Sequence, residues 1–318
     1  LKVLKRNWMM RDAFIRELLT LAEMDSNVIL ITADLGFGIF EKFEERFPNQ
    51  FLNVGVSEQN MTMVAAGMAM EGKKVFTYSI GNFPTLRCLE QIRIDVCYHL
   101  LNVNIICSGG GFSYGQLGMS HHATEDLSIM RALPNMVVVA PSSVSEVRGA
   151  MHALYKLPGP SYLRLDKSKT DCDTAKNLFQ FGKAEQVRDG YGVTLVGCGG
   201  IVEELVVAAN ALKFEGIDCR ILSMASVKPI DGNALRIAAQ ETRGIITLEE
   251  NNIIGGLGSA VAEVCLESNI RPGFFKRIGL NDTYSSIVGD QYYLRYHYEM
   301  SSQHIIQAVR KLWNESTL

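Results

Sequence analysis

Residues Gly55–Gly72 read GVSEQNMTMVAAGMAMEG, a polar turn followed by a helix of small and apolar residues at Met61–Met70. Glu58 stands at the junction between the turn and the helix. Ligands bind beside the carboxyl ends of strands in parallel sheets, and a carboxylic acid placed there can share a proton with a ring nitrogen. The simpler interpretation is that Glu58 only helps to cap the helix after Ser57. Spacing alone favours the cap, because capping residues are common and catalytic residues are few.

On both sides of this stretch, short apolar runs alternate with helical patterns. In the first half, strands are expected at residues 27–32, 74–78, 103–107, 136–140 and 161–165, and helices at 61–70, 85–99, 126–132 and 144–157. Continuous apolar strands that alternate with helices predict a mainly parallel sheet covered on both faces.

The polar stretch Asp166–Phe181 has no clear period and is predicted to be a linker. The alternation then restarts, with strands expected at residues 192–196, 219–224 and 244–248, and helices at 202–214, 233–240, 257–268 and 302–313. A chain of 318 residues suits two domains better than one. We therefore predict the α/β class, with two domains at residues 1–172 and 183–318, each a mainly parallel sheet flanked by helices.

Composition narrows the possible functions. The formal net charge is -3 and no run of Lys and Arg forms a basic stripe, which argues against nucleic-acid binding. No stretch approaches the roughly 20 apolar residues of a membrane span. The seven cysteines form no Cys-x-x-Cys pair, as expected of free thiols in a reducing compartment, so a cytoplasmic location is predicted.

A second candidate segment, Gly109–Arg131, reads GGGFSYGQLGMSHHATEDLSIMR. Its glycines open a permissive loop that reaches His121 and His122 before an acidic helix start. Adjacent residues of an extended chain point to opposite sides, so the pair is a poor metal motif and no metal site is predicted. One histidine could act as an acid, a base or a hydrogen-bond donor, or could only cap the helix. Both interpretations stay open.

The glycines of Leu195–Gly200, LVGCGG, invite a dinucleotide-binding interpretation that the sequence does not support. The G-x-G-x-x-G pattern needs glycine at position 202, which is Val202. These glycines are interpreted as tight strand-to-helix turns.

Taken in order, six segments resemble the pyrimidine-binding and C-terminal domains of the transketolase family. They are Ala33–Leu35 (ADL), Gly55–Gly72, Ser120–Pro141 (SHHATEDLSIMRALPNMVVVAP), Gly159–Ser168 (GPSYLRLDKS), Val227–Asp231 (VKPID) and Leu248–Val264 (LEENNIIGGLGSAVAEV). The resemblance covers nearly the whole chain, and the combination is far more specific than any one motif.

The resemblance implies a thiamine-diphosphate-dependent enzyme that transfers a two-carbon ketol unit from a ketose to an aldose. The family's diphosphate-binding domain, with its Gly-Asp-Gly and Asn motif, has no counterpart in this sequence. The chain therefore resembles the C-terminal subunit of a split transketolase. We expect an N-terminal diphosphate-binding subunit as partner, holding Mg²⁺ (or Ca²⁺) and the diphosphate, in an α2β2 heterotetramer.

The resemblance also assigns cofactor-binding residues. Glu58 matches the acid that hydrogen-bonds the aminopyrimidine ring, and Asp34 and Leu35 lie in the matching ADL motif. Tyr78 and Phe83, in the segment YSIGNFPT, are the candidates for the aromatic side chain that stacks on the pyrimidine. Phe83 is preferred.

For the substrate, His121 matches the family's substrate-contacting histidine, and His122 is the alternative. Arg11 and Lys167 are expected to supply outer positive charges. Three departures concern the sugar. The position of the family's phosphate-binding histidine falls in a stretch that here reads Ser-Gly-Gly-Gly, Ser108–Gly111, and an aspartate of the family is matched by Leu117. The serine after the family's ADL motif is matched by glycine, at about Gly38. Lysine is also a poorer bidentate phosphate clamp than arginine. A modified, shorter or unphosphorylated sugar is therefore expected, rather than an ordinary sugar phosphate.

Three other functions compete with this one. A related thiamine-diphosphate enzyme could be a carboligase such as deoxyxylulose-phosphate synthase, or a 2-oxo acid dehydrogenase beta subunit, against which the double histidine argues. A non-catalytic regulatory subunit would have no need of Glu58. A nucleotide-binding dehydrogenase rests only on the failed glycine pattern.

Overall fold

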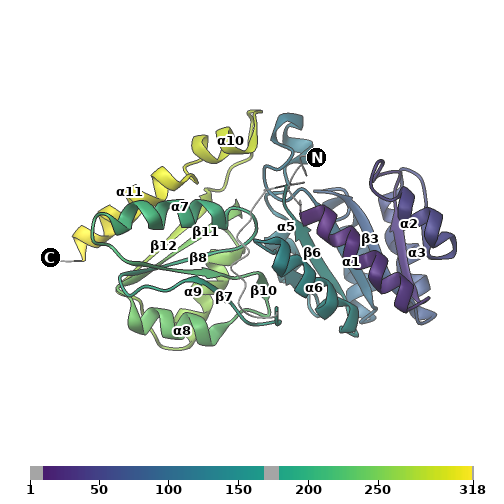
Figure 1. Cartoon of the computed structure of the whole chain (residues 1–318), viewed down its shortest axis with the longest axis horizontal. Helices are drawn as coiled ribbons and strands as arrows, with labels where there is room; N and C mark the ends of the chain where they lie inside the picture. Colours follow the sequence, from purple (N-terminus) through teal and green to yellow (C-terminus); the bar gives the residue numbers. More distant parts are fainter. Residues whose placement is uncertain (1–9, 168–178, 317–318) are drawn as a thin grey trace, which may run out of the picture.

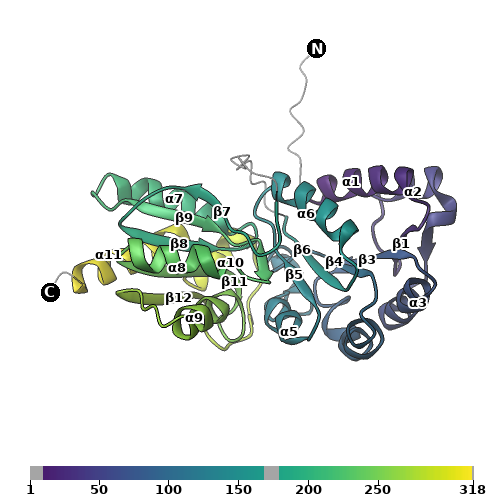
Figure 2. The same cartoon turned by 90° about the horizontal axis from the view of Figure 1, so that it is seen from below.

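The computed structural model describes residues 10–167 and 179–316 and contains two α/β domains side by side, confirming the expected class (Figure 1). The view from below shows helices on both faces of each sheet (Figure 2). Most of the predicted linker, and the expected domain end at residue 172, lie outside the described residues. The domain limits therefore stay a prediction.

The first sheet has seven strands in the order β10-β5-β6-β4-β3-β1-β2. The strands are β1 (Val28–Thr32), β2 (Phe51–Asn53), β3 (Lys74–Ile80), β4 (Val103–Ser108), β5 (Val137–Val139), β6 (Ser161–Leu165) and β10 (Ser226–Lys228). All neighbours pair in parallel except β10, which pairs antiparallel with β5. Because β10 belongs to the second half of the chain, the two domains share this sheet.

Helices cover the first sheet on two faces, each with its own apolar core. They are α1 (Met10–Met24), α2 (Glu41–Arg46), α3 (Glu58–Met70), α4 (Leu89–Gln91), α5 (Asp126–Ala132) and α6 (Val144–Lys156). One core joins α1 and α6 to the sheet, and the other joins α3 to its opposite face. The single helix expected at 85–99 is instead a 3₁₀ turn, the short α4 and a π-helix at Ile92–Tyr98.

The second sheet has five strands in the order β12-β11-β8-β9-β7. They are β7 (Glu185–Arg188), β8 (Val193–Gly197), β9 (Cys219–Ser223), β11 (Gly244–Asn252) and β12 (Phe274–Leu280). Among the strands of the described residues in this sheet, only β7 pairs antiparallel, with β9. Five helices accompany the sheet: α7 (Val202–Lys213), α8 (Gly232–Glu241), α9 (Leu257–Glu267), α10 (Gln291–His297) and α11 (Ser302–Glu315).

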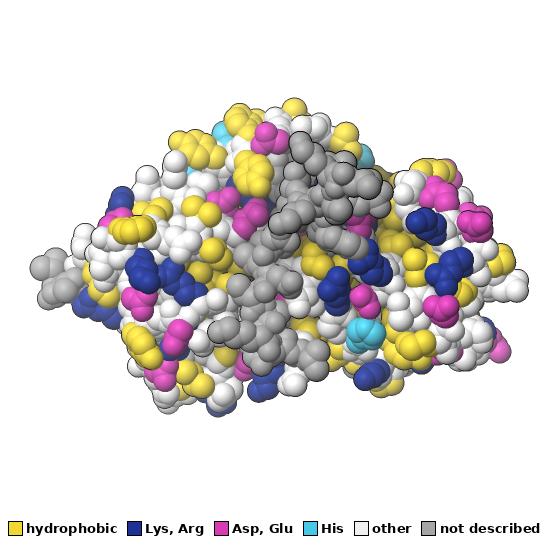
Figure 3. Space-filling model, in the orientation of Figure 1, with side chains coloured by type: hydrophobic (Ala, Val, Ile, Leu, Met, Phe, Trp, Pro, Cys, Tyr) yellow, Lys and Arg dark blue, Asp and Glu magenta, His cyan; other side chains and the backbone are white. Residues whose placement is uncertain are grey.

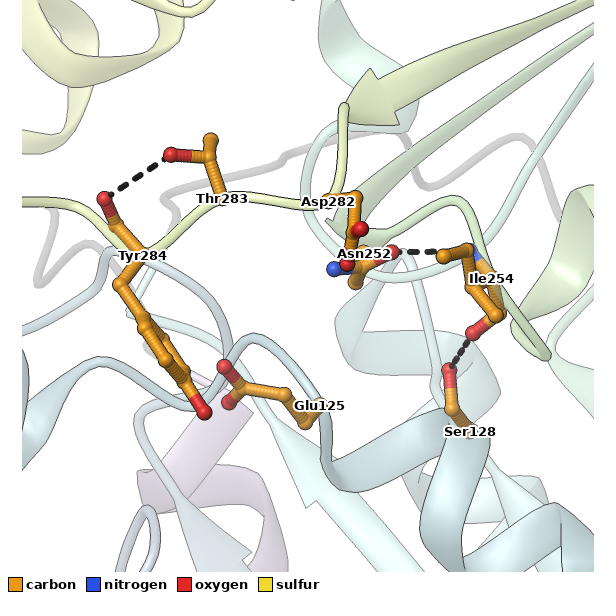
Figure 4. Close-up of a pocket in the computed structure, with 7 residues that line it drawn as sticks. All are labelled: Glu125, Ser128, Asn252, Ile254, Asp282, Thr283 and Tyr284. Atoms are coloured by element: carbon orange, nitrogen blue, oxygen red, sulfur yellow. Dashed lines mark hydrogen bonds between the residues drawn. The ribbon is translucent and has the colours of Figure 1, made fainter.

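Polar contacts cross the junction between the domains. On α5, the Ser128 hydroxyl donates to the Ile254 carbonyl at 2.7 Å, beside a cavity of about 530 Å³ (Figure 4). Arg164 of β6 donates to the Glu250 carbonyl at 2.8 Å, and the Gly200 N–H donates to Asp166 at 2.5 Å. The domains are therefore held in one arrangement by directional bonds as well as by shared sheet pairing.

On the face shown in Figure 3, acidic and basic side chains are intermixed. Among the described residues, no helix combines the length and the apolar character needed to cross a bilayer.

A buried carboxylate binds the start of α9. Glu249 accepts hydrogen bonds from the backbone N–H groups of Leu257 at 2.7 Å and Gly258 at 2.8 Å, where a helix N-terminus favours negative charge. Burial nevertheless raises the pKa of Glu249 to about 7, because desolvation outweighs these hydrogen bonds.

This pKa makes Glu249 a source of pH-dependent stability. A carboxyl group whose pKa is raised in the folded state stabilises the fold below its unfolded pKa and loses that contribution as pH rises through about 7. Between pH 5 and 8, the free energy of unfolding of the wild type should fall on the order of 1–3 kcal/mol more than that of Glu249→Gln. Urea denaturation measures it, with the exposed Glu267→Gln as control. Parallel curves for wild type and Glu249→Gln would contradict the assignment.

Candidate active site

Most of the candidate residues lie along one edge of the first sheet. Asp34 follows β1, Glu58 follows β2, Phe83 follows β3 and Lys167 follows β6, each within five residues of the strand's end. The carboxyl ends of parallel strands meet at this edge, which is where open α/β sheets bind ligands.

Glu58 is the first residue of α3, and its side chain is only 3% exposed. Ser57 does not cap the helix with its side chain; its hydroxyl donates to the Val54 carbonyl at 3.0 Å. The Glu58 carboxylate accepts a hydrogen bond from Arg87 Nη1 at 2.7 Å through Oε2. The residue is therefore a buried, paired acid.

Arg87 connects this acid to an aromatic ring. Its guanidinium carbon lies 4.5 Å from the centre of the Phe83 ring, a cation–π distance. Its carbonyl accepts from Gln59 Nε2 at 3.1 Å, which ties the Arg87 backbone to α3. Sequence reasoning missed Arg87, because nothing in the local pattern at 85–99 shows that it pairs with a residue 29 positions earlier.

Glu58, Arg87 and Phe83 form a line of successive contacts along the sheet edge. His121 is the next residue in this line. Its ring meets Phe83 edge-on at 5.2 Å and lies 6.3 Å from the Tyr114 ring. Burial, and then His122, lowers the pKa of His121, so the imidazole is neutral near pH 7 and can both donate and accept a hydrogen bond. Tyr114 is a second contact that the sequence did not single out.

Positive charge follows at the far end of the line. Lys167 Nζ lies 3.5 Å from the centre of the Tyr114 ring. Burial, and then the charge of Arg11, lowers the pKa of Lys167, so the two cations act on each other. Arg11 Nε is buried and has no hydrogen-bond partner among residues 10–167 and 179–316. Two neighbouring cations can bind an anionic group.

Tyr78 and His122 do not belong to this line of contacts; both side chains are buried elsewhere. Tyr78 is 2% exposed, with its ring stacked on Phe14 at 5.9 Å and edge-on to Phe40 at 4.8 Å. Burial raises its pKa to about 12. His122 is fully buried, with Nε2 at 3.1 Å from the Gly115 carbonyl oxygen. Tyr78 therefore belongs to the apolar core, and His122 contacts the backbone of the loop that carries His121.

Asp34 and Leu35 occupy the edge mainly through their backbone. Asp34 has a positive φ of 55° and donates its N–H to Asn53 Oδ1 at 2.9 Å. The Leu35 carbonyl accepts from the Thr32 hydroxyl at 2.7 Å. The first bond holds the end of β1 against the end of β2, and the second closes the turn that follows β1.

Two family models together cover most of the sequence. The transketolase pyrimidine-binding domain matches residues 6–171, and the transketolase C-terminal domain matches residues 182–305. The chain belongs to the transketolase family. Its two domains are the ones that the six sequence segments predicted.

Two relatives of nearly the same length as this chain are named as subunits of transketolases. The chain is 34% identical to the 6-deoxy-6-sulfo-D-fructose transketolase subunit SqwH of Clostridium sp., over 97% of this chain and 95% of that protein. It is also 34% identical to a subunit of the apulose-4-phosphate transketolase of Phocaeicola vulgatus, over 93% of this chain and 94% of that protein. A 1-deoxy-D-xylulose-5-phosphate synthase of Pelotomaculum thermopropionicum is 33% identical over 94% of this chain but 47% of that protein.

A solved structure of similar sequence has the same fold along nearly its whole length. A split gene transketolase, described as an inactive beta4 tetramer, superposes with a TM-score of 0.86 at 34% identity, covering 96% of this chain and 98% of that one. The chain is thus a transketolase-type transferase that corresponds to the C-terminal subunit of a split transketolase.

Transketolase-family membership carries a dependence on thiamine diphosphate. The edge fits the pyrimidine part of that cofactor, because Arg87 joins a buried acid to a half-buried aromatic ring there. Glu58 accepts from Arg87 through Oε2, and the same arginine lies over the Phe83 ring. A planar heterocycle with ring nitrogens requires this combination of hydrogen-bonding group and aromatic face.

The Glu58–Arg87 pair should stabilise the isolated chain. Arg87→Ala leaves the buried carboxylate without its cation, so the free energy of unfolding should fall by about 1–2 kcal/mol, less than for a fully buried pair because Arg87 is half-exposed. Urea denaturation measures it, with exposed Arg93→Ala as the matched control, and a Glu58→Gln/Arg87→Ala cycle isolates the coupling. Equal effects of the two arginine variants would refute the pairing.

Proposed function

We propose that Glu58 is the acid that activates the thiamine diphosphate cofactor, with Phe83 as the ring that stacks on the pyrimidine. The single observation that carries this is the buried carboxylate at the start of α3, with one oxygen bonded to Arg87 and the half-buried Phe83 beside it. Tyr78, packed in the core, is not part of the proposal. Asp34 and Leu35 contribute backbone groups to the same edge.

The chemistry divides between cofactor and chain. When bound, thiamine diphosphate supplies the electron sink for two-carbon ketol transfer. Glu58 holds a proton against the pyrimidine nitrogen, and Arg87 fixes the orientation of the carboxylate. Phe83 excludes water from one face of the ring.

His121 is proposed to hydrogen-bond the reacting sugar. Its lowered pKa keeps the ring neutral, so that the ring can pass a proton to or from a hydroxyl group near neutral pH. Lys167 and Arg11 then bind the far end of the substrate. Their neighbouring positive charges favour an anionic group on the substrate. The departures from the family pattern within Ser108–Gly111 and at Leu117 support a modified sugar, and His122 holds the loop from the core.

A partner subunit is proposed to hold the diphosphate and its Mg²⁺ or Ca²⁺. Relatives of nearly equal length are named as subunits, which supports an N-terminal diphosphate-binding subunit and an α2β2 assembly. The similar split-gene structure is described as an inactive tetramer of beta chains, which supports self-association without activity. We place the complex in the cytoplasm, in keeping with the free, buried cysteines among the described residues.

The second candidate is carboligation of a 2-oxo acid with an aldehyde. Its support is the 33% identity to a 1-deoxy-D-xylulose-5-phosphate synthase. A 2-oxo acid dehydrogenase beta subunit is the remaining alternative. Both release carbon dioxide from pyruvate, whereas ketol transfer does not.

Glu58→Ala, reconstituted with the diphosphate-binding subunit, should lose about 10²–10⁴-fold in turnover, because proton placement at the cofactor is lost. Light scattering should show an unchanged assembly. Glu71→Ala, an exposed acid after the last turn of the same helix, is the control and should keep full activity. Unchanged turnover in Glu58→Ala would eliminate the proposed mechanism.

The substrate proposal is tested by steady-state kinetics on a panel of sugars. A modified sugar with an anionic group should have a higher kcat/KM than the xylulose and ribose phosphate pair, and Lys167→Ala should raise its KM. A preference for the ordinary phosphate pair would overturn the substrate assignment, and carbon dioxide release from pyruvate would favour the second candidate.

A further inference from the structure

An isolated antiparallel bridge between Gly111 and Ala123 closes the base of the loop that carries His121. Gly111 and Ala123 exchange two backbone hydrogen bonds, at 2.8 and 3.0 Å, in an isolated bridge. Gly109 N–H donates to the Leu165 carbonyl at 2.6 Å, which fixes the strand side of the base to β6. The position of this base therefore sets where the loop presents His121.

A side chain of the second domain is bonded to this base. Glu250, on β11, accepts the Phe112 backbone N–H at 2.5 Å through Oε1, and its side chain is almost fully buried. Its carboxylate also fills the space beside Gly111, where an added Cβ would lie 2.6 Å from it. Gly111 has a φ of 56°, so the close approach and the backbone conformation both require glycine.

Glu250 is in turn held by helix α10. Arg295 Nε donates to its Oε2 at 2.6 Å, and Gln291 Nε2 lies within 2.9 and 3.1 Å of its two oxygens. Arg295 also donates to Glu203 on α7 at 2.6 Å. The carboxylate thus joins the His121 loop to two helices of the second domain.

The path from Glu250 to the histidines runs through packed rings. The Phe112 ring is buried edge-on against His122 at 5.2 Å, and the stacked ring of Tyr298 covers Phe112 at 5.5 Å. His122 bonds Gly115 inside the loop, and His121 is the next residue back along the chain. A shift of the Phe112 backbone would therefore move His121 relative to Phe83.

We propose that Glu250 is a positioning residue for His121, so that the second domain acts on the substrate end of the site. This rests on the proposed substrate role of His121. A role confined to joining the domains would not require contact with the loop, and Glu203 provides the comparison. It binds the same arginine, Arg295, from α7, and within residues 10–167 and 179–316 its side chain makes no hydrogen bond to the loop.

Glu250→Gln and Glu203→Gln each remove one carboxylate partner of Arg295, but only the first touches the loop. In the reconstituted complex, Glu250→Gln should lower kcat/KM for the sugar about 10–100-fold, mainly through KM, because small misplacements of a contacting group are costly. Glu203→Gln should keep kcat/KM within about threefold of the wild type. Thiamine diphosphate affinity, by equilibrium dialysis, should be unchanged in both.

A readout without cofactor or substrate separates this inference from the proposed function. In the chain labelled at histidine, the His121 ring signals should shift by NMR in Glu250→Gln and stay in place in Glu203→Gln. If Glu250→Gln does not fold, the milder Gln291→Ala should show the same signature to a smaller degree. Equal effects of both glutamine variants on KM, or unmoved His121 signals in the folded Glu250 variant, would overturn the proposal.

Discussion

A charged carboxylate in the interior is stabilised by a neighbouring cation, since an uncompensated charge there costs several kcal/mol. Two such pairs bear on the candidate site, Glu58 with Arg87 and Glu250 with Arg295. Each pair joins segments far apart in the sequence, so neither exists until the surrounding elements are packed. The first pair orients the acid at the sheet edge, and the second anchors the loop that faces it.

The sheet was largely predictable and its edges were not. Strands such as Val28–Thr32 and Val103–Ser108 are continuous apolar runs, buried on both sides, and that pattern is local. The three residues of β10 carry no such pattern, because they form a strand only by pairing with β5 of the other domain. Helix α1 was not predicted although its buried Phe14, Leu18 and Leu21 follow a helical period, so that signal was available.

The site was predictable only in part, for a similar reason. Local pattern favoured a cap at Glu58, and the resemblance to a family reversed that preference. In the structure the Glu58 carboxylate accepts a hydrogen bond from Arg87, and Ser57, at the N-cap, makes no side-chain cap. Arg87 and Tyr114 escaped notice because their importance lies in contacts across 29 residues and across a loop, which no spacing rule encodes. Tyr78 was indistinguishable in sequence from a surface aromatic, and only packing against Phe14 and Phe40 places it in the core.

The three glycines at 109–111 lie between the domain junction and the candidate substrate site. By resemblance, a phosphate-binding histidine of the family falls in this stretch. Here a side chain at Gly110 would collide with Arg164, and one at Gly111 with Glu250. A histidine at position 110 or 111 is incompatible with the buried network that joins the domains. Under the proposed substrate role, the charge at the far end of the substrate comes from another element, and Lys167, over Tyr114 and acting on Arg11, is in a position to supply it. The packing at the domain junction thus constrains which residues of this loop could contact a sugar.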